Sequence, residues 1–89
     1  MLSDIIKAEY VDEYKIKLTF ENGKKGIVDF RMYLEKGGVF KKFKDLAFFR
    51  AFHLDKEIGN VIWNDEIDIA PETLYYLATA TAKKTYKNQ

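Results

Sequence analysis

Apolar and polar residues alternate along residues 14–20, and this alternation predicts the clearest strand of the chain. The apolar positions are Tyr14, Ile16, Leu18 and Phe20, and the polar positions between them are Lys15, Lys17 and Thr19. Such regular alternation is typical of an antiparallel sheet with one face on the core and the other in solvent. Residues 4–11 predict a preceding strand, with Ile6, Ala8 and Tyr10 on one face.

The Asn-Gly sequence that follows predicts a turn into a third strand at residues 25–30. A two-residue loop would send Val28 and Phe30 to the solvent face, whereas a three-residue loop, 21–23, keeps both on the core face. This loop needs a residue with positive φ, which Gly23 supplies. The expected register places Ile16 opposite Val28 and Tyr14 opposite Phe30.

Helical spacing replaces alternation after this strand and predicts short helices. The apolar positions are Met32, Tyr33 and Leu34 before the Gly37-Gly38 pair, and Val39, Phe40 and Phe43 after it, with Lys41, Lys42 and Lys44 outward. Asp45 is a good N-cap for a further short helix over residues 46–51, in which Leu46 and Phe49 share a face.

Two more strands, at residues 52–56 and 61–64, are expected to form a second hairpin around a turn at 57–60. The pattern leaves the register of this hairpin open. Residues 64–68 predict a tight acidic turn, and Pro71 stands at the first position of a C-terminal helix, where proline is favoured. The inward stripe of that helix is Leu74, Leu77, Ala78 and Thr81, and residues 83–89 are expected to form a frayed tail.

These elements predict a single α+β domain over residues 1–89. We expect an antiparallel sheet of four to five strands, with the C-terminal helix and the short middle helix packed on one face. The charged fraction is 33% and the net charge is +1, so no global field attracts a polyanion. The chain has no Cys, which excludes disulfides, thiol catalysis and Cys-based zinc sites and favours a cytoplasmic location. No signal peptide and no membrane-spanning run are visible, so no membrane association is expected.

Residues that build common catalytic sites are scarce in this chain. His53 is the only histidine and Ser3 is the only serine, and neither has a visible acid–base partner. No phosphate-binding glycine loop is present. We therefore expect a protein that is not an enzyme, with no cofactor and no metal site.

The acidic turn is the first candidate for a binding surface. Asp65, Glu66 and Asp68 present carboxylates that could meet basic residues of a protein partner or a hard cation, although their spacing does not match an EF-hand loop. The alternative is a local role. Asp68 would accept backbone N–H groups at the helix start, in place of Ala70, which cannot cap.

Trp63 precedes this turn and admits two interpretations. A tryptophan at the surface would anchor a protein partner or stack on a ligand. A tryptophan in the core would instead pair its N–H with an internal acceptor. The candidate partner-binding residues are therefore Trp63, Asp65, Glu66 and Asp68.

A basic segment at residues 36–44 supports a second hypothesis. Lys41, Lys42 and Lys44 could contact phosphates, with Phe40 and Phe43 stacking on bases, which would make a weak nucleic-acid-binding module. The alternative is that both rings face the core and the lysines form a solvated face, because the two Phe residues are three apart.

The order of these motifs resembles a bacterial family of short proteins of unknown function, of the kind named after the N-terminal domain of an ammonia-oxidiser protein. The resemblance covers roughly residues 5–76. The motifs are Phe20-Glu21-Asn22-Gly23, Asp29-Phe30, Gly38-Val39-Phe40, Phe48 or Phe49, and the W-x-x-x-x-D-x-x-P-E-x-L-Y ending within Ile62 to Tyr75. Two departures concern the acidic turn: Ala70 replaces a capping residue, and Asn64 to Glu66 replace Pro and Gly.

This resemblance implies an α+β fold with an antiparallel sheet and no established activity. Some relatives carry a helix-turn-helix domain, and many short members look like partners in toxin–antitoxin-like gene pairs. We therefore expect a non-catalytic interaction module with a protein partner. Homo-oligomerisation through an edge strand is also open, because such a sheet has edges.

Overall fold

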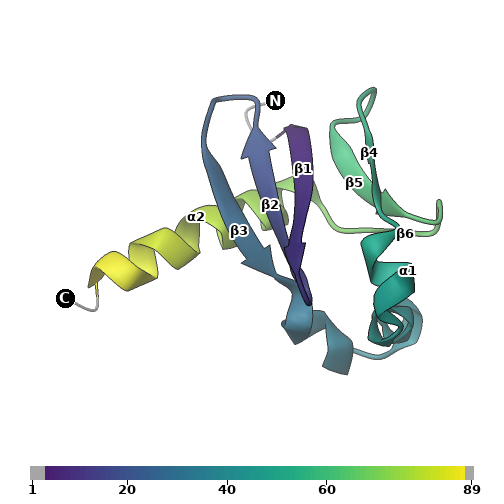
Figure 1. Ribbon diagram of the computed structural model, residues 1–89. Helices are drawn as coiled ribbons and strands as arrows, with labels where there is room; N and C mark the ends of the chain where they lie inside the picture. The colour runs from purple at the N-terminus through teal and green to yellow at the C-terminus, as the bar shows by residue number, and fades with distance from the viewer. Residues whose placement is uncertain (1–3, 88–89) are drawn as a thin grey trace.

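Two small antiparallel sheets and one long helix form the computed structural model, which describes residues 4–87, with side chains over residues 4–80 (Figure 1). The first sheet has the order β1 (Ile5–Asp12), β2 (Lys15–Phe20) and β3 (Lys25–Asp29). The second has the order β4 (His53–Asp55), β5 (Asn60–Trp63) and β6 (Ile67–Asp68). The helices are η1 (Phe30–Glu35), η2 (Gly38–Lys44), α1 (Leu46–Arg50) and α2 (Pro71–Lys87).

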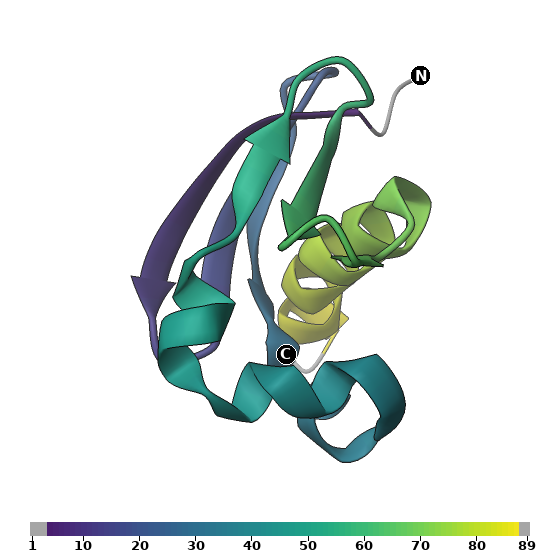
Figure 2. The same cartoon turned by 90° about the vertical axis from the view of Figure 1, so that its right-hand side faces the viewer.

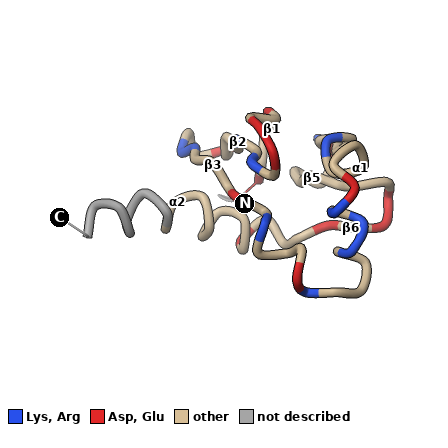
Figure 3. The backbone as a smooth tube through the Cα atoms, turned by 60° about the horizontal axis from the view of Figure 1, so that its bottom comes forward, with Lys and Arg blue, Asp and Glu red and all other residues tan. Residues whose placement is uncertain are grey.

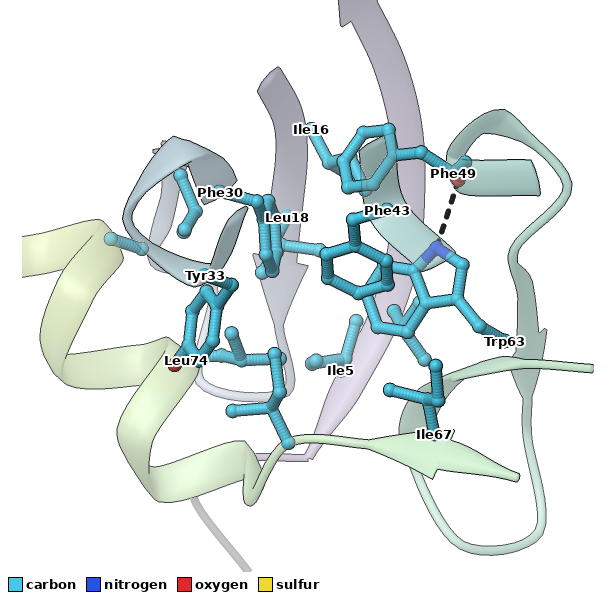
Figure 4. Packing of buried hydrophobic residues seen from close by; sticks show 14 of the residues in the cluster. Ile5, Ile16, Leu18, Phe30, Tyr33, Phe43, Phe49, Trp63, Ile67 and Leu74 are labelled. Atoms are coloured by element: carbon cyan, nitrogen blue, oxygen red, sulfur yellow. Dashed lines mark hydrogen bonds between the residues drawn. The ribbon is translucent and has the colours of Figure 1, made fainter. Parts of the chain in front are cut away.

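The α+β class is confirmed, but the expected single sheet of four to five strands is two sheets of three strands each. The two sheets meet at one end, where the Ile5 N–H donates to the Gly59 carbonyl over 2.9 Å. Away from that end, buried aromatic rings such as Phe49 and Trp63 fill the space between them (Figure 4). A short sixth strand, β6, also forms at the end of the segment expected to be only a turn.

The register of the β2–β3 hairpin is confirmed. Ile16 lies opposite Val28, and the Phe30 N–H donates to the Tyr14 carbonyl over 2.8 Å. Gly23 has a φ of 91° within the three-residue loop that the pattern predicts. Ile16, Leu18 and Phe20 of β2 are buried in the core, as alternation requires, and Tyr14 before the strand packs against them half-buried.

The first strand departs from simple alternation at Ile6. Its ladder with β2 shifts register between Ile5 and Lys7, which is a β-bulge. The extra residue turns Ile6 outward, with 54% of its surface exposed, and buries Ile5 instead. The expectation that Ile6 shares a face with Ala8 and Tyr10 was therefore wrong, because a bulge reverses the alternation on one side of it.

An aromatic cluster forms the centre of the core (Figure 4). Phe43 lies 4.8 Å from Trp63 and 5.2 Å from Phe49, measured between ring centroids. Phe30, the first residue of η1, contacts the same three rings. Because these rings come from four separate elements, η1, η2, α1 and β5, their contacts join the two sheets into one core.

The middle helices form as predicted, with three exceptions on their faces. The Asp45 carboxylate accepts the Ala47 N–H over 3.1 Å and caps α1. Met32, Val39 and Leu46, however, are 49%, 48% and 38% exposed. Helices this short bury only one or two side chains each, and Phe43 in η2 and Phe49 in α1 occupy those positions.

The C-terminal helix packs on the core-facing side of the first sheet, at β3 (Figure 2). A Cβ atom on Gly26 would lie 2.5 Å from the Ala78 carbonyl oxygen, so only glycine permits this approach. Leu74 and Ala78 are buried and Leu77 is half-buried, whereas the Thr81 side chain lies outside the described residues.

The α2 helix begins at Pro71, as predicted, and runs to Lys87. The start of the frayed tail expected at residue 83 is therefore helical, because residues 80–84 are mostly Ala and Lys, which are good helix formers, and contain no Gly or Pro. No helix in the described part of the chain is long and apolar enough to cross a membrane.

Candidate functional site

The turn between β5 and β6 has an unusual backbone. Asn64 and Asp65 both have positive φ, at 54° and 58°, and the Glu66 N–H donates to the Trp63 carbonyl over 3.1 Å. This is the φ pattern of a type I′ turn, in which Asn and Asp are the non-glycine residues best tolerated. The chain thus reverses here without glycine and places two acidic residues, Asp65 and Glu66, at the tip.

A hollow of about 200 Å³ lies beside this turn. It is lined by Ile62, Asp65, Glu66, Ile67 and Asp68. We call the three carboxylates on its rim, Asp65, Glu66 and Asp68, the acidic corner. The sequence-predicted acidic residues are therefore brought together on one surface.

Glu66 is already engaged within the protein. Its carboxylate oxygens accept from the Lys42 ammonium over 2.9 and 3.0 Å, and the Asn64 amide donates to it over 2.9 Å. The hydrogen bond from Lys42, followed by that from Asn64, lowers the pKa of Glu66 below its usual value. Lys42 was a candidate of the basic segment, so this ion pair joins the two predicted sites. Basic and acidic positions of the backbone lie close together around β6 (Figure 3).

Asp65 and Asp68 are the carboxylates of the acidic corner that remain free within residues 4–80. Both residues are exposed, and neither carboxylate forms a hydrogen bond or ion pair there. The expectation that Asp68 caps α2 was therefore wrong. Asp68 belongs to β6, where it pairs with Ile62, and an extended residue of that ladder does not reach the first turn of the helix.

Trp63 belongs to the core. Its side chain is 0% exposed, and its indole N–H donates to the Phe49 carbonyl over 2.8 Å (Figure 4). The core interpretation is confirmed, and the candidate role of Trp63 as a surface anchor was wrong because no part of the ring reaches solvent. Its contribution to the acidic corner is to hold the start of the β5–β6 turn.

The basic segment shows a similar division between core and surface. Phe43 is 0% exposed, and Phe40 is half-buried against Tyr33, with ring centroids 5.0 Å apart. Lys41 and Lys44 are exposed. Stacking of Phe43 on a base is therefore excluded, and only the lysines remain available to phosphates.

The described residues contain no group of three or more His, Cys, Asp or Glu side chains placed to hold a metal ion. His53 lies exposed on β4, and no acid–base partner contacts it in residues 4–80. Ser3 lies outside the described residues.

Asn60 is a polar residue whose importance the pattern did not indicate. It is 4% exposed, and its side-chain amide donates to the Ile69 carbonyl over 3.0 Å. This bond ties β5 to the segment between β6 and α2. A single polar residue at a predicted turn gives no sign of burial, so only the tertiary structure reveals this role.

The fold and site define a small α+β domain whose basic segment and acidic corner are joined by the Lys42–Glu66 ion pair. The described residues contain no recognisable set of catalytic side chains. The family model described as "Protein of unknown function (DUF2442)" matches residues 5–80. The chain belongs to this family, which agrees with the resemblance noted from its motifs. Searches of curated proteins and of solved structures returned no match.

Proposed function

We propose that this protein is a non-catalytic module that binds another protein through the acidic corner. The observation that carries the proposal is the pair of free carboxylates, Asp65 and Asp68, on the rim of an open hollow. A basic segment of a partner would face both charges and gain two ion pairs without breaking an internal one.

The Lys42–Glu66 pair has a supporting role in this arrangement. It fixes the η2 segment against the turn and consumes one carboxylate, so the free negative charge is concentrated on Asp65 and Asp68. Rim charges of this kind mainly set association rate and partner choice. Binding should therefore weaken as the salt concentration rises.

Asn substitutions test this surface without disturbing the turn, since Asn tolerates the positive φ of Asp65. A bait of the full chain would be co-expressed with the products of neighbouring genes, and captured proteins would be identified. The double variant Asp65→Asn/Asp68→Asn should weaken the captured complex at least about tenfold.

The matched control removes two acidic charges from the first sheet, in Glu9→Gln/Asp12→Asn. It should bind as the wild type does. Equal binding by all three proteins would reject the acidic corner as the surface. A stoichiometric partner encoded by an adjacent gene would support the more specific proposal of a toxin–antitoxin-like pair acting in the cytoplasm.

Nucleic-acid binding by Lys41, Lys42 and Lys44 is the alternative proposal, and it has less support. Lys42 is paired with Glu66, and the acidic corner lies beside the basic segment, where it repels phosphates. A gel mobility shift at low salt that disappears in Lys41→Ala/Lys44→Ala would revive this alternative. No shift at low salt would remove it.

A further inference from the structure

The outer edge of β3 is open in the described part of the chain, because β3 pairs only with β2 there. The Phe20 N–H donates to the Lys24 carbonyl, and the Phe30 N–H donates to the Tyr14 carbonyl, each over 2.8 Å. In an antiparallel ladder the direction alternates, so the backbone groups of Lys25 and Ile27 point away from β2.

This edge lacks several of the features that prevent strand addition, although Lys25 places one charge on it. Natural edge strands are protected by charged side chains such as Lys, by proline, by bulges or by a covering element. The β2–β3 ladder is regular over β3, and the strand contains no proline. The α2 helix packs on the core-facing side of Gly26, and no other strand lies along the outer edge of β3 in the described part of the chain (Figures 1 and 2).

The solvent-facing side chains of β3 would complement those of β3 in a second copy of the protein. In an antiparallel pair related by a two-fold axis through Ile27, Ile27 faces Ile27 of the second copy and Lys25 faces its Asp29. All three residues share the solvent face of the sheet, and Ile27 is 45% exposed there. Directly opposed apolar and oppositely charged pairs of this kind stabilise a sheet.

The local contacts of Asp29 are compatible with this arrangement. Only Oδ1 is used at short range, accepting the Arg31 N–H over 3.0 Å, which leaves Oδ2 available to an opposing lysine. The Lys25 ammonium makes no ion pair among residues 4–80. Each copy thus contributes the free Lys25 ammonium and the partly free Asp29 carboxylate. Because the two strands run in opposite directions, each lysine lies opposite the aspartate of the other copy.

We propose that β3 pairs with β3 of a second copy and forms a homodimer with one continuous sheet across the two-fold axis. The contact lies on the first sheet, away from the acidic corner, and is independent of the proposed function. A strand-edge interface of this length is small, so the dimer should be populated at roughly tens of micromolar and above.

Disulfide trapping tests the register directly, because the chain has no Cys of its own. Opposed residues in a hydrogen-bonded antiparallel pair have Cα atoms about 5.5 Å apart, within the disulfide range. Ile27→Cys should therefore form a covalent dimer under mild oxidation. Ile58→Cys is the control, because Ile58 lies in the β4–β5 turn and is slightly more exposed than Ile27, at 52% against 45%; it should form far less covalent dimer.

Sedimentation over a range of protein concentrations tests the dimer without cross-linking. Ile27→Pro removes an outward N–H without breaking the β2–β3 ladder and should abolish association. Lys25→Glu should raise the dissociation constant about tenfold by opposing two carboxylates. Lys17→Glu, the same charge change on the central strand, is the control and should leave association unchanged.

A wild-type protein that stays monomeric into the millimolar range would overturn the proposal. So would a dimer that persists unchanged in both Ile27→Pro and Lys25→Glu, since it would have to use another surface. Circular dichroism of each variant establishes that its fold is retained, and Lys25→Glu supplies the test if Ile27→Pro does not fold.

Discussion

The two hairpins that end in tight turns, β2–β3 and β5–β6, solve the same backbone problem with different residues. The first places its positive φ on Gly23, at 91°, where glycine adopts it at no steric cost. The second places positive φ on Asn64 and Asp65, which have side chains and tolerate it less well. The difference indicates that the second turn retains an acidic side chain at the expense of some stability, as functional sites often do.

The side chains of the two turns also differ in how many contacts they make with the rest of the fold. In the first turn, Asn22 Oδ1 accepts the Lys24 N–H over 3.0 Å, and the Asn22 side-chain N–H donates to the Tyr75 hydroxyl over 3.0 Å, so this side chain is bound into the fold. At the second turn, Asp65 and Asp68 have no such contacts in residues 4–80. One turn is used for folding, whereas the other leaves charges available at the surface.

Trp63→Ala should have the largest effect on stability, because Trp63 anchors the β5–β6 hairpin in the core. Trp63 is fully buried and contacts four aromatic rings. A free energy of unfolding lower by about 3–5 kcal/mol is expected. Chemical denaturation would measure it, and Tyr76→Ala, at a residue 67% exposed, is the control. A loss similar to that control would contradict the central place of Trp63 in the core.

Gly26→Ala should cause the next largest loss of stability, and it tests the β2–β3 hairpin. The added methyl would lie 2.5 Å from the Ala78 carbonyl oxygen, so α2 must move away from β3. We expect a loss of about 1–3 kcal/mol by thermal unfolding. Lys25→Ala, at the adjacent solvent-facing position, should cost much less. Equal stability of the two variants would mean that α2 does not pack closely here.

Glycine substitutions at the turns compare the two hairpins directly. Gly23→Ala should destabilise the protein by about 1–2 kcal/mol, because alanine resists positive φ. Asp65→Gly should stabilise it by up to about 1 kcal/mol by relieving the same strain. If Asp65→Gly were instead as destabilising as Gly23→Ala, the acidic turn would not be strained, and the comparison drawn above would fail.

The ionisation of Glu66 should give the smallest effect. Its pKa is lowered by the Lys42 hydrogen bond, so its stabilising contribution is present above the unfolded value near 4.5 and is lost as the pH falls through the folded value. Carboxyl NMR titration should show the pKa rising in Lys42→Ala. Lys41→Ala should leave it in place, and a pKa unaffected by either change would show that the ion pair does not persist in solution.

Short-range signals in the sequence predicted several parts of this fold. The alternation of residues 14–20 together with Gly23 determined the β2–β3 register. Asp45 marked the start of α1, and Pro71 marked the start of α2. Each of these features depends on residues within one hairpin or one helical turn, where periodicity, capping and turn geometry act directly.

The candidate site was predicted only in part. The acidic residues of the corner are neighbours in sequence, so their clustering followed from the turn. The burial of Trp63 and the loss of the expected Asp68 cap did not, since both depend on what packs around them. Asn60 was missed entirely because burial of one polar side chain leaves no periodic signal.

The sequence by itself thus determined the class of fold, the first hairpin and the starts of two helices. Only the tertiary structure decided that the strands form two sheets, that Ile6 is displaced by a bulge, and that Lys42 neutralises Glu66. The physical reason is the separation of the contacting residues along the sequence. Lys42 and Glu66 are 24 positions apart, and such contacts arise when aromatic rings from separate elements pack together, which local periodicity does not encode.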